Sequence, residues 1–142
     1  MKLRINKFWF TFSVVKIMYM FFALFVYTKF TSLGDTARYL SGETVGSATW
    51  YMNSTHMMDL LAYSFSIVLG PVLANLPFVF LSLFGIIYAV KRLELSNNEL
   101  VPLLIILSFP SFGIWTSVAS KESVTVFYLG IILGFIIDLS KH

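Results

Sequence analysis

The chain has 142 residues, of which 58% are hydrophobic and only 12% are charged. Soluble domains carry about 25% charged residues, and a soluble fold of this size leaves much of its surface in water. The composition therefore excludes an ordinary soluble domain. The net charge of +3 is scattered along the chain and does not indicate a nucleic-acid partner, and the lack of cysteine excludes disulfides and thiolate metal sites.

Unbroken apolar runs of about twenty residues predict transmembrane α-helices, because barrel strands would alternate apolar and polar residues. We therefore expect an all-α integral membrane protein with one membrane domain over 1–142. It should contain about four transmembrane helices and an interfacial or re-entrant helix in the first outer loop. The expected elements are a span over 8–27, an outer loop over 28–59, an interfacial helix over 56–69, and spans over 72–90, 101–120 and 123–139.

The first span follows a basic leader that contains Lys2, Arg4 and Lys7. Its apolar run exceeds the roughly 7–15 residues of a signal peptide and no small-residue cleavage site follows, so we expect an uncleaved signal anchor. Lys16 lies near the middle of this span, where an ammonium group costs about 2.5–3.5 kcal/mol. Its side chain is expected either to face the helix bundle or to extend toward the inner surface.

The run over 60–90 contains no charged residue. As one helix it would be roughly 46 Å long, which exceeds a hydrocarbon core of about 30 Å. Gly70-Pro71 predicts a break, because proline removes a backbone donor and clashes with the preceding turn. A second proline, Pro110, predicts a bend in the third span.

A polar stripe precedes this break. His56, Asp59 and Tyr63 have helical spacing on one face, which is typical of an interfacial helix. One histidine and one aspartate are too few to indicate a metal site. The residues expected to cap this helix are Asn53, Ser54 or Thr55.

Lys and Arg residues near the span ends are distributed unequally. One side of the membrane would hold Lys2, Arg4, Lys7, Lys91, Arg92 and Lys141, and the other side Lys29, Arg38 and Lys121. Because basic residues favour the cytoplasmic side, both termini are expected to be cytoplasmic in a multi-pass protein of the cell membrane. The loop over 28–59 is then outside.

Two short stretches could carry chemistry at the outer surface. In the first, Asp35 is expected either to cap a short helix that begins at Thr36, with Tyr39 as an interfacial anchor, or to act as a base. Arg38 could clamp a phosphate, because a guanidinium fork matches its geometry.

The second stretch ends the third span. Trp115 should reach the membrane interface there, and Lys121-Glu122 should form a very short hairpin. These two charges are either a solvated ion pair or part of a lipid-phosphate site.

The motifs Gly34-Asp35-x-x-Arg38-Tyr39 and Pro110-Ser111…Trp115-Thr116-Ser117…Lys121-Glu122 resemble the N-terminal part of polytopic polysaccharide polymerases and GT-C-type glycosyltransferases. These include O-antigen and capsule polymerase-like proteins of bacteria. The resemblance implies that Asp35 activates the acceptor and that Arg38 and Lys121 bind the phosphate of a polyprenyl-phosphate-linked glycan. It makes Tyr39, Trp115 and Glu122 further substrate-binding residues, with no metal or cofactor.

Members of these families usually have more spans, so the resemblance also implies a fragment, a truncated homologue or a partner-dependent subunit. The alternative is a non-enzymatic accessory or inhibitory subunit that packs against a larger membrane enzyme through Gly130-x-x-x-Gly134. A small transporter or channel subunit with Lys16 in its pathway is a weaker alternative. If the first hypothesis is correct, Asp35, Arg38, Lys121 and Glu122 should lie in one polar pocket, with Glu122 holding Arg38.

Overall fold

The computed structural model describes residues 7–43, 45 and 53–141, and every regular element in this part of the chain is a helix. The all-α prediction is therefore confirmed for the described residues. The elements are α1 (Lys7–Phe25), the 3₁₀ turn η1 (Tyr27–Lys29), α2 (Thr36–Ser41), α3 (Ser54–Leu73), α4 (Leu76–Arg92), α5 (Asn97–Ile106), α6 (Pro110–Trp115) and α7 (Lys121–Ser140).

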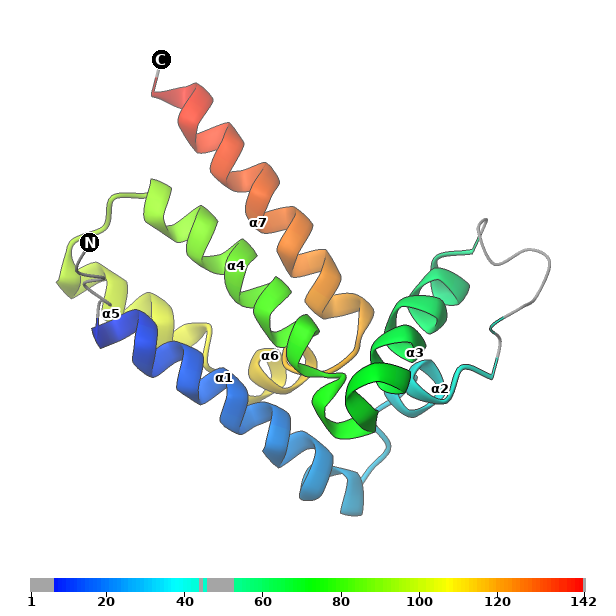
Figure 1. Cartoon of the computed structure of the whole chain (residues 1–142). Helices are drawn as coiled ribbons and strands as arrows, with labels where there is room; N and C mark the ends of the chain where they lie inside the picture. The colour runs from blue at the N-terminus through cyan, green and yellow to red at the C-terminus, as the bar shows by residue number, and fades with distance from the viewer. Residues whose placement is uncertain (1–6, 44, 46–52, 142) are drawn as a thin grey trace.

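Helices α4 and α7 lie side by side and run in the same direction (Figure 1). Two glycines allow the close approach: a Cβ atom at Gly130 would lie 2.6 Å from the Cα of Gly85. One turn further along, a Cβ at Gly134 would meet the Tyr88 ring at 2.5 Å. The Gly130-x-x-x-Gly134 pattern thus packs against α4 within the chain. In this structure α4 therefore occupies the face that the alternative assigned to a larger enzyme.

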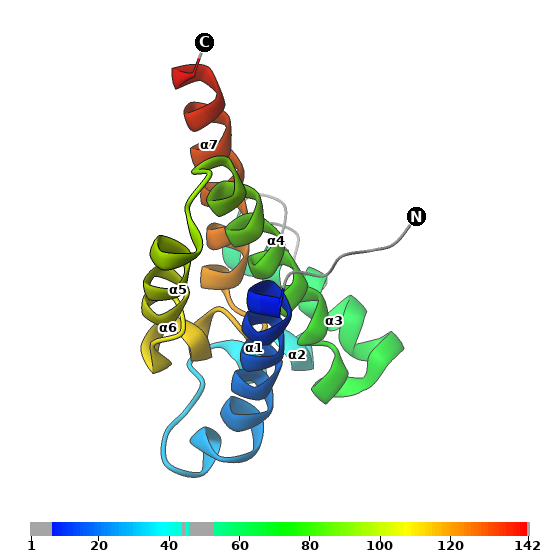
Figure 2. The same ribbon diagram turned by 90° about the vertical axis from the view of Figure 1, so that its left-hand side faces the viewer.

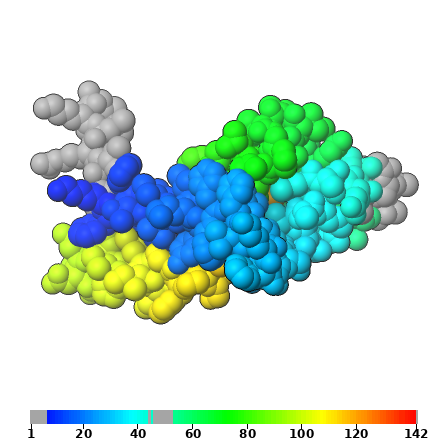
Figure 3. All heavy atoms as spheres, turned by 90° about the horizontal axis from the view of Figure 1, so that it is seen from below, coloured from blue at the N-terminus to red at the C-terminus, as the bar shows by residue number. Residues whose placement is uncertain are grey.

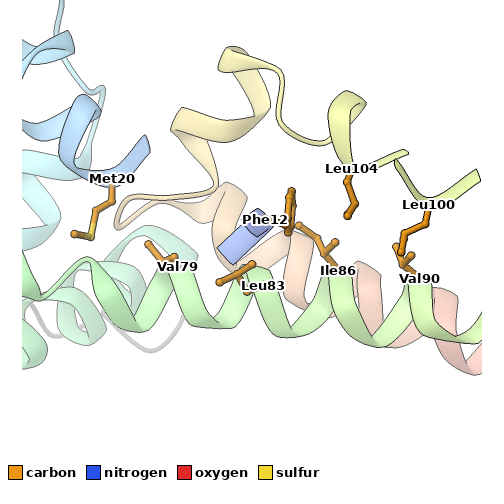
Figure 4. Close-up of a cluster of buried hydrophobic side chains, with 8 residues drawn as sticks. All are labelled: Phe12, Met20, Val79, Leu83, Ile86, Val90, Leu100 and Leu104. Atoms are coloured by element: carbon orange, nitrogen blue, oxygen red, sulfur yellow. The ribbon is translucent and has the colours of Figure 1, made fainter. Parts of the chain in front are cut away.

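The main apolar core lies between α4, α1 and α5. Figure 4 shows side chains from these three helices pointing toward one another. The core consists of Phe12, Met20, Val79, Leu83, Ile86, Val90, Leu100 and Leu104. Figure 2 shows α5 and α6 together on one side of this arrangement, and in Figure 3 α1 crosses the face seen from below, between α5–α6 and α3.

Among the described residues, three helical stretches are long and apolar enough to cross a membrane: Lys7–Lys29, Ser54–Leu73 and Lys121–Ser140. The outward face of α7 agrees with this, because its apolar side chains there are 51–60% exposed: Leu129, Ile132, Leu133, Phe135, Ile136 and Leu139. The number of such stretches, three, differs from the four transmembrane helices expected from the sequence. Helix α4, which corresponds to the expected span over 72–90, has only 17 residues.

The third span, expected over 101–120 with a bend at Pro110, is interrupted at that proline, and its helix does not continue to residue 120. Helix α5 ends at Ile106, α6 covers only Pro110–Trp115, and the residues from Thr116 to Ser120 are not helical. The physical reason is Pro110, because the residue before a proline is driven out of the helical region. Phe109 accordingly has φ −59° and ψ 140°.

The expected break at Gly70-Pro71 is confirmed, because Gly70 has φ 78° and ψ 162° inside α3. The helical part before the break covers 54–69, close to the expected interfacial helix over 56–69, and α3 continues after the break to Leu73. Counted across the break, α3 has 20 residues and the length of a membrane span, whereas the sequence predicted an interfacial or re-entrant helix there. Asn53 caps α3 as expected, since its side chain accepts a hydrogen bond from the Thr55 amide at 2.9 Å.

Charged side chains join the end of α4 to the end of α7. The Nε of Arg92 donates to Asp138 at 2.6 Å, and the Nζ of Lys141 donates to Glu94 at 2.6 Å. The turn after α4 and the end of α7 therefore lie at the same end of the molecule. The basic residues Arg92 and Lys141, which were assigned to one side of the membrane, are close together in space.

Candidate functional site

A buried, non-helical segment from Thr116 to Ser120 lies at the centre of the molecule, directly before α7. Its five residues are 0–3% exposed. Irregular backbone at this depth requires partners for its polar groups, because no water is present to satisfy them. Side chains from three other parts of the chain supply these partners.

The carbonyl oxygen of Thr116 accepts two hydrogen bonds from different helices. The Nζ of Lys16 on α1 donates at 2.8 Å, and the Oγ of Ser82 on α4 donates at 2.7 Å. Lys16 also donates to the Thr116 hydroxyl and lies 5.7 Å from the centre of the Phe112 ring. Of the two orientations that the sequence allowed, Lys16 thus adopts the one that faces the bundle, with 1% exposure.

Asn75, in the turn between α3 and α4, holds the same segment from another side. It is fully buried, and its Oδ1 accepts from the Ala119 amide at 2.8 Å. Its side-chain nitrogen donates to the carbonyl of Pro71 at 2.9 Å. Sequence reasoning missed Asn75, although a lone asparagine inside an uncharged run of 31 residues was a usable signal.

The buried segment determines where the expected site residues lie. Trp115 ends α6 directly before it, and Lys121 and Glu122 begin α7 directly after it. The Nζ of Lys121 donates to the Thr55 hydroxyl of α3 at 2.6 Å. Lys121 therefore connects the start of α7 to the start of α3.

Asp35 precedes α2, as expected, but its carboxylate does not cap that helix. It instead accepts from the Tyr39 hydroxyl at 3.2 Å and lies 3.3 Å from the Nη1 of Arg38. Burial of the ring and the neighbouring Asp35 raise the pKa of Tyr39 to about 12. The cap prediction is thus wrong, because a ring hydroxyl and a guanidinium compete for the carboxylate.

Arg38 pairs with two carboxylates. Besides Asp35, its Nε lies 3.6 Å from the Oδ1 of Asp59 on α3, and its guanidinium lies 5.1 Å from the Tyr39 ring centre. Asp59 is fully buried, so it is not part of an exposed interfacial stripe as expected. Among the described residues, Asp35 and Asp59 hold Arg38, whereas Glu122 was expected to do so.

Five of the six expected site residues line one pocket of about 300 Å³, here called the polar pocket. They are Asp35, Tyr39, Trp115, Lys121 and Glu122. Arg38 is the exception and lies behind Asp35, on the side of Asp59. Sequence reasoning therefore found residues 80 positions apart that the fold brings together, but it assigned Arg38 to the pocket lining.

Two further hollows adjoin the polar pocket. The first, the α1–α2 hollow, has about 590 Å³, is lined mainly by apolar residues between Leu24 and Val72, and shares Leu33, Gly34 and Thr36 with the polar pocket. The second, the α6–α7 hollow, has about 550 Å³ and shares Trp115, Lys121 and Glu122 with it. The three cavities are thus neighbours with shared walls.

Within the described residues, no cluster of three or more potential metal ligands occurs. Neither a protein-family model, nor a curated protein, nor a solved structure matches this chain. The chemistry of the polar pocket and the two hollows therefore follows from the residues that line them.

Proposed function

We propose that this chain is a membrane protein whose polar pocket binds a polyprenyl-phosphate-linked glycan at the outer surface, in the manner of a glycosyltransferase or polysaccharide polymerase. The observation that carries the proposal is the meeting of Asp35, Tyr39, Trp115, Lys121 and Glu122 in one pocket that adjoins the mainly apolar α1–α2 hollow. A ligand that fits must have a polar head and an apolar chain. A lipid-linked sugar has both.

The charged residues at the site have different proposed roles. Asp35, Glu122 and Asp59 outnumber Arg38 and Lys121, and Arg38 is already paired with two carboxylates. This balance is poor for a highly charged anion but suits sugar hydroxyls, which donate to carboxylates. Lys121 is the cation that lines the pocket and binds the single phosphate, while Arg38 orients Asp35.

Aromatic residues complete the sugar site. Trp115 and Tyr39 line the same pocket, and the Trp115 ring lies edge-on to Tyr27, with 6.5 Å between the ring centres. The electron-rich face of an indole ring attracts the C–H groups of a pyranose. In this arrangement Asp35 would remove the proton of an acceptor hydroxyl, the role implied for it by the family resemblance.

The proposed topology places both termini in the cytoplasm. In it α1, α4, the broken α5–α6 segment and α7 cross the membrane. Helix α3, broken at Gly70, lies at the interface or re-enters the membrane, and the outer loop with α2 covers the polar pocket. The unequal Lys and Arg distribution and the shared end of α4 and α7 support this arrangement. The chain lacks cysteine, so single-cysteine variants at the exposed positions Ser32 and Asn98 test it directly. Impermeant thiol reagents should label Ser32→Cys but not Asn98→Cys from outside, and the reverse pattern would refute the topology.

A binding experiment tests the proposed function. Purified protein in detergent micelles is titrated with a polyprenyl phosphate and with the polyprenol of the same chain length. We expect tighter binding of the phosphate, and a loss of this preference of roughly tenfold or more in Lys121→Ala, because a charge-assisted contact is removed. Lys29→Ala, which alters an exposed lysine outside the three hollows, is the matched control. Equal binding of phosphate and alcohol by the unmodified chain would refute the proposal.

A further inference from the structure

One buried hydroxyl at the junction between the polar pocket and the α1–α2 hollow has no partner. Thr36 is 2% exposed, and among the described residues its Oγ1 makes no hydrogen bond. Thr36 nevertheless lines both the polar pocket and the α1–α2 hollow. A buried polar group without a partner is costly, so this hydroxyl requires an explanation.

The surroundings of Thr36 change from polar to apolar across this one residue. On one side lie Asp35, Tyr39 and Lys121 in the polar pocket. On the other side the lining of the α1–α2 hollow is mainly apolar and includes Leu24, Phe25 and Val72, although the hydroxyl residues Thr28, Thr31, Ser32 and Ser41 also line it. Helix α1 and the stretch that contains Val72 are both long and apolar enough to lie in a membrane.

We infer that Thr36 recognises the junction between the phosphate and the hydrocarbon chain of a single-chain lipid phosphate, with the chain lying in the α1–α2 hollow. The inference rests on the proposed function and assigns it a specificity-determining residue. The methyl and hydroxyl groups of threonine are similar in size, so rotation about χ1 exchanges them without a change of shape. The hydroxyl then donates to a non-bridging oxygen of the phosphate, next to the first carbon of the chain.

The walls shared by the α1–α2 hollow and the polar pocket favour one ligand that occupies both. The hollow shares Leu33, Gly34 and Thr36 with a pocket that contains a lysine, and its volume of about 590 Å³ is sufficient for a hydrocarbon chain. Free phosphate would use the lysine but leave the apolar hollow empty. A lipid without a charged head would fill the hollow but leave Lys121 and Thr36 unused.

The variant Thr36→Val tests this role because it keeps the shape of the side chain and removes the hydroxyl. Removing a buried hydroxyl that has no partner does not weaken the fold, so the melting temperature should stay the same or rise. Binding of farnesyl phosphate should weaken roughly tenfold, since a hydrogen bond to a charged head group is lost. Two further titrations measure the contributions of the head and the chain separately: inorganic phosphate for the head and farnesol for the chain. Each should bind much more weakly than farnesyl phosphate.

Ser117→Ala is the matched control. Ser117 is also fully buried with no hydrogen-bond partner for its Oγ in the described part of the chain, but it lines none of the three hollows. This variant should leave both stability and binding unchanged.

Two results would overturn the inference alone: Thr36→Val that binds farnesyl phosphate as tightly as the unmodified chain, or a melting temperature that falls with the affinity. If the unmodified chain does not prefer farnesyl phosphate to farnesol, the proposed function itself fails and the role of Thr36 fails with it. Tight binding of inorganic phosphate alone would assign the polar pocket to a free anion and likewise refute the lipid.

Discussion

The Nζ of Lys16 donates a hydrogen bond of 2.8 Å to the carbonyl oxygen of Thr116, a residue one hundred positions later in the chain. This contact joins the middle of α1 to the buried segment that separates α6 from α7. It explains how a lysine can lie within an apolar span. The amino group takes the place of water for a backbone carbonyl that has left the helix.

Reversing the charge of residue 16 should disrupt the fold. In Lys16→Glu, a carboxylate would face the Thr116 carbonyl and hydroxyl, and an unpaired buried charge typically costs about 3–5 kcal/mol. We expect little folded protein by size-exclusion chromatography in detergent. Lys29→Glu, at an exposed position after α1, should behave like the unmodified chain. A Lys16→Glu protein with normal stability would contradict the role assigned to this contact.

Replacing Asn75 should lower the free energy of unfolding more than replacing Ser82. Asn75→Ala leaves the buried Ala119 amide without an acceptor, which should lower the free energy of unfolding by about 1–3 kcal/mol. Ser82→Ala should cost less, about 1 kcal/mol at most, because Lys16 still donates to the Thr116 carbonyl. Chemical unfolding in mixed micelles measures both. The reverse order would show that the segment is not held as described.

The apolar runs were sufficient to predict an all-helical chain and the break at Gly70, because both follow from local hydrophobicity and proline geometry. The segment from Thr116 to Ser120 could not be predicted as irregular, since its small residues also fit a helix end. Its conformation depends on Lys16, Asn75 and Ser82, which are distant in the sequence. The same limit applies to Gly85, whose function is visible only once Gly130 lies against it.

The candidate site was also predictable only in part. The residue types in 34–40 and 110–122 indicated a polar site, and five of the six residues do share a pocket. The partner of Arg38 could not be predicted, because Asp59 belongs to another helix and its burial depends on how α2 packs on α3.

The ionisation of Tyr39 tests the geometry around Asp35. Its pKa is raised to about 12, first by burial and then by the charge and hydrogen bond of Asp35. The phenol should therefore be only about one-tenth ionised at pH 11, where a tyrosine with an ordinary pKa of about 10 is mostly ionised. The difference in ultraviolet absorbance between the unmodified chain and Tyr39→Phe isolates this group. Asp35→Asn should move the ionisation to lower pH, and an unchanged titration in that variant would contradict the contact.

The most direct test of the central claim maps where a lipid phosphate binds. A polyprenyl phosphate with a photoreactive diazirine near its head group is cross-linked to the protein in micelles, and the labelled peptides are identified by mass spectrometry. The account predicts labels within 33–39 and 115–122, which unlabelled polyprenyl phosphate removes and polyprenol does not. Labels spread along the exposed faces of α1 and α7, and unaffected by competition, would contradict it.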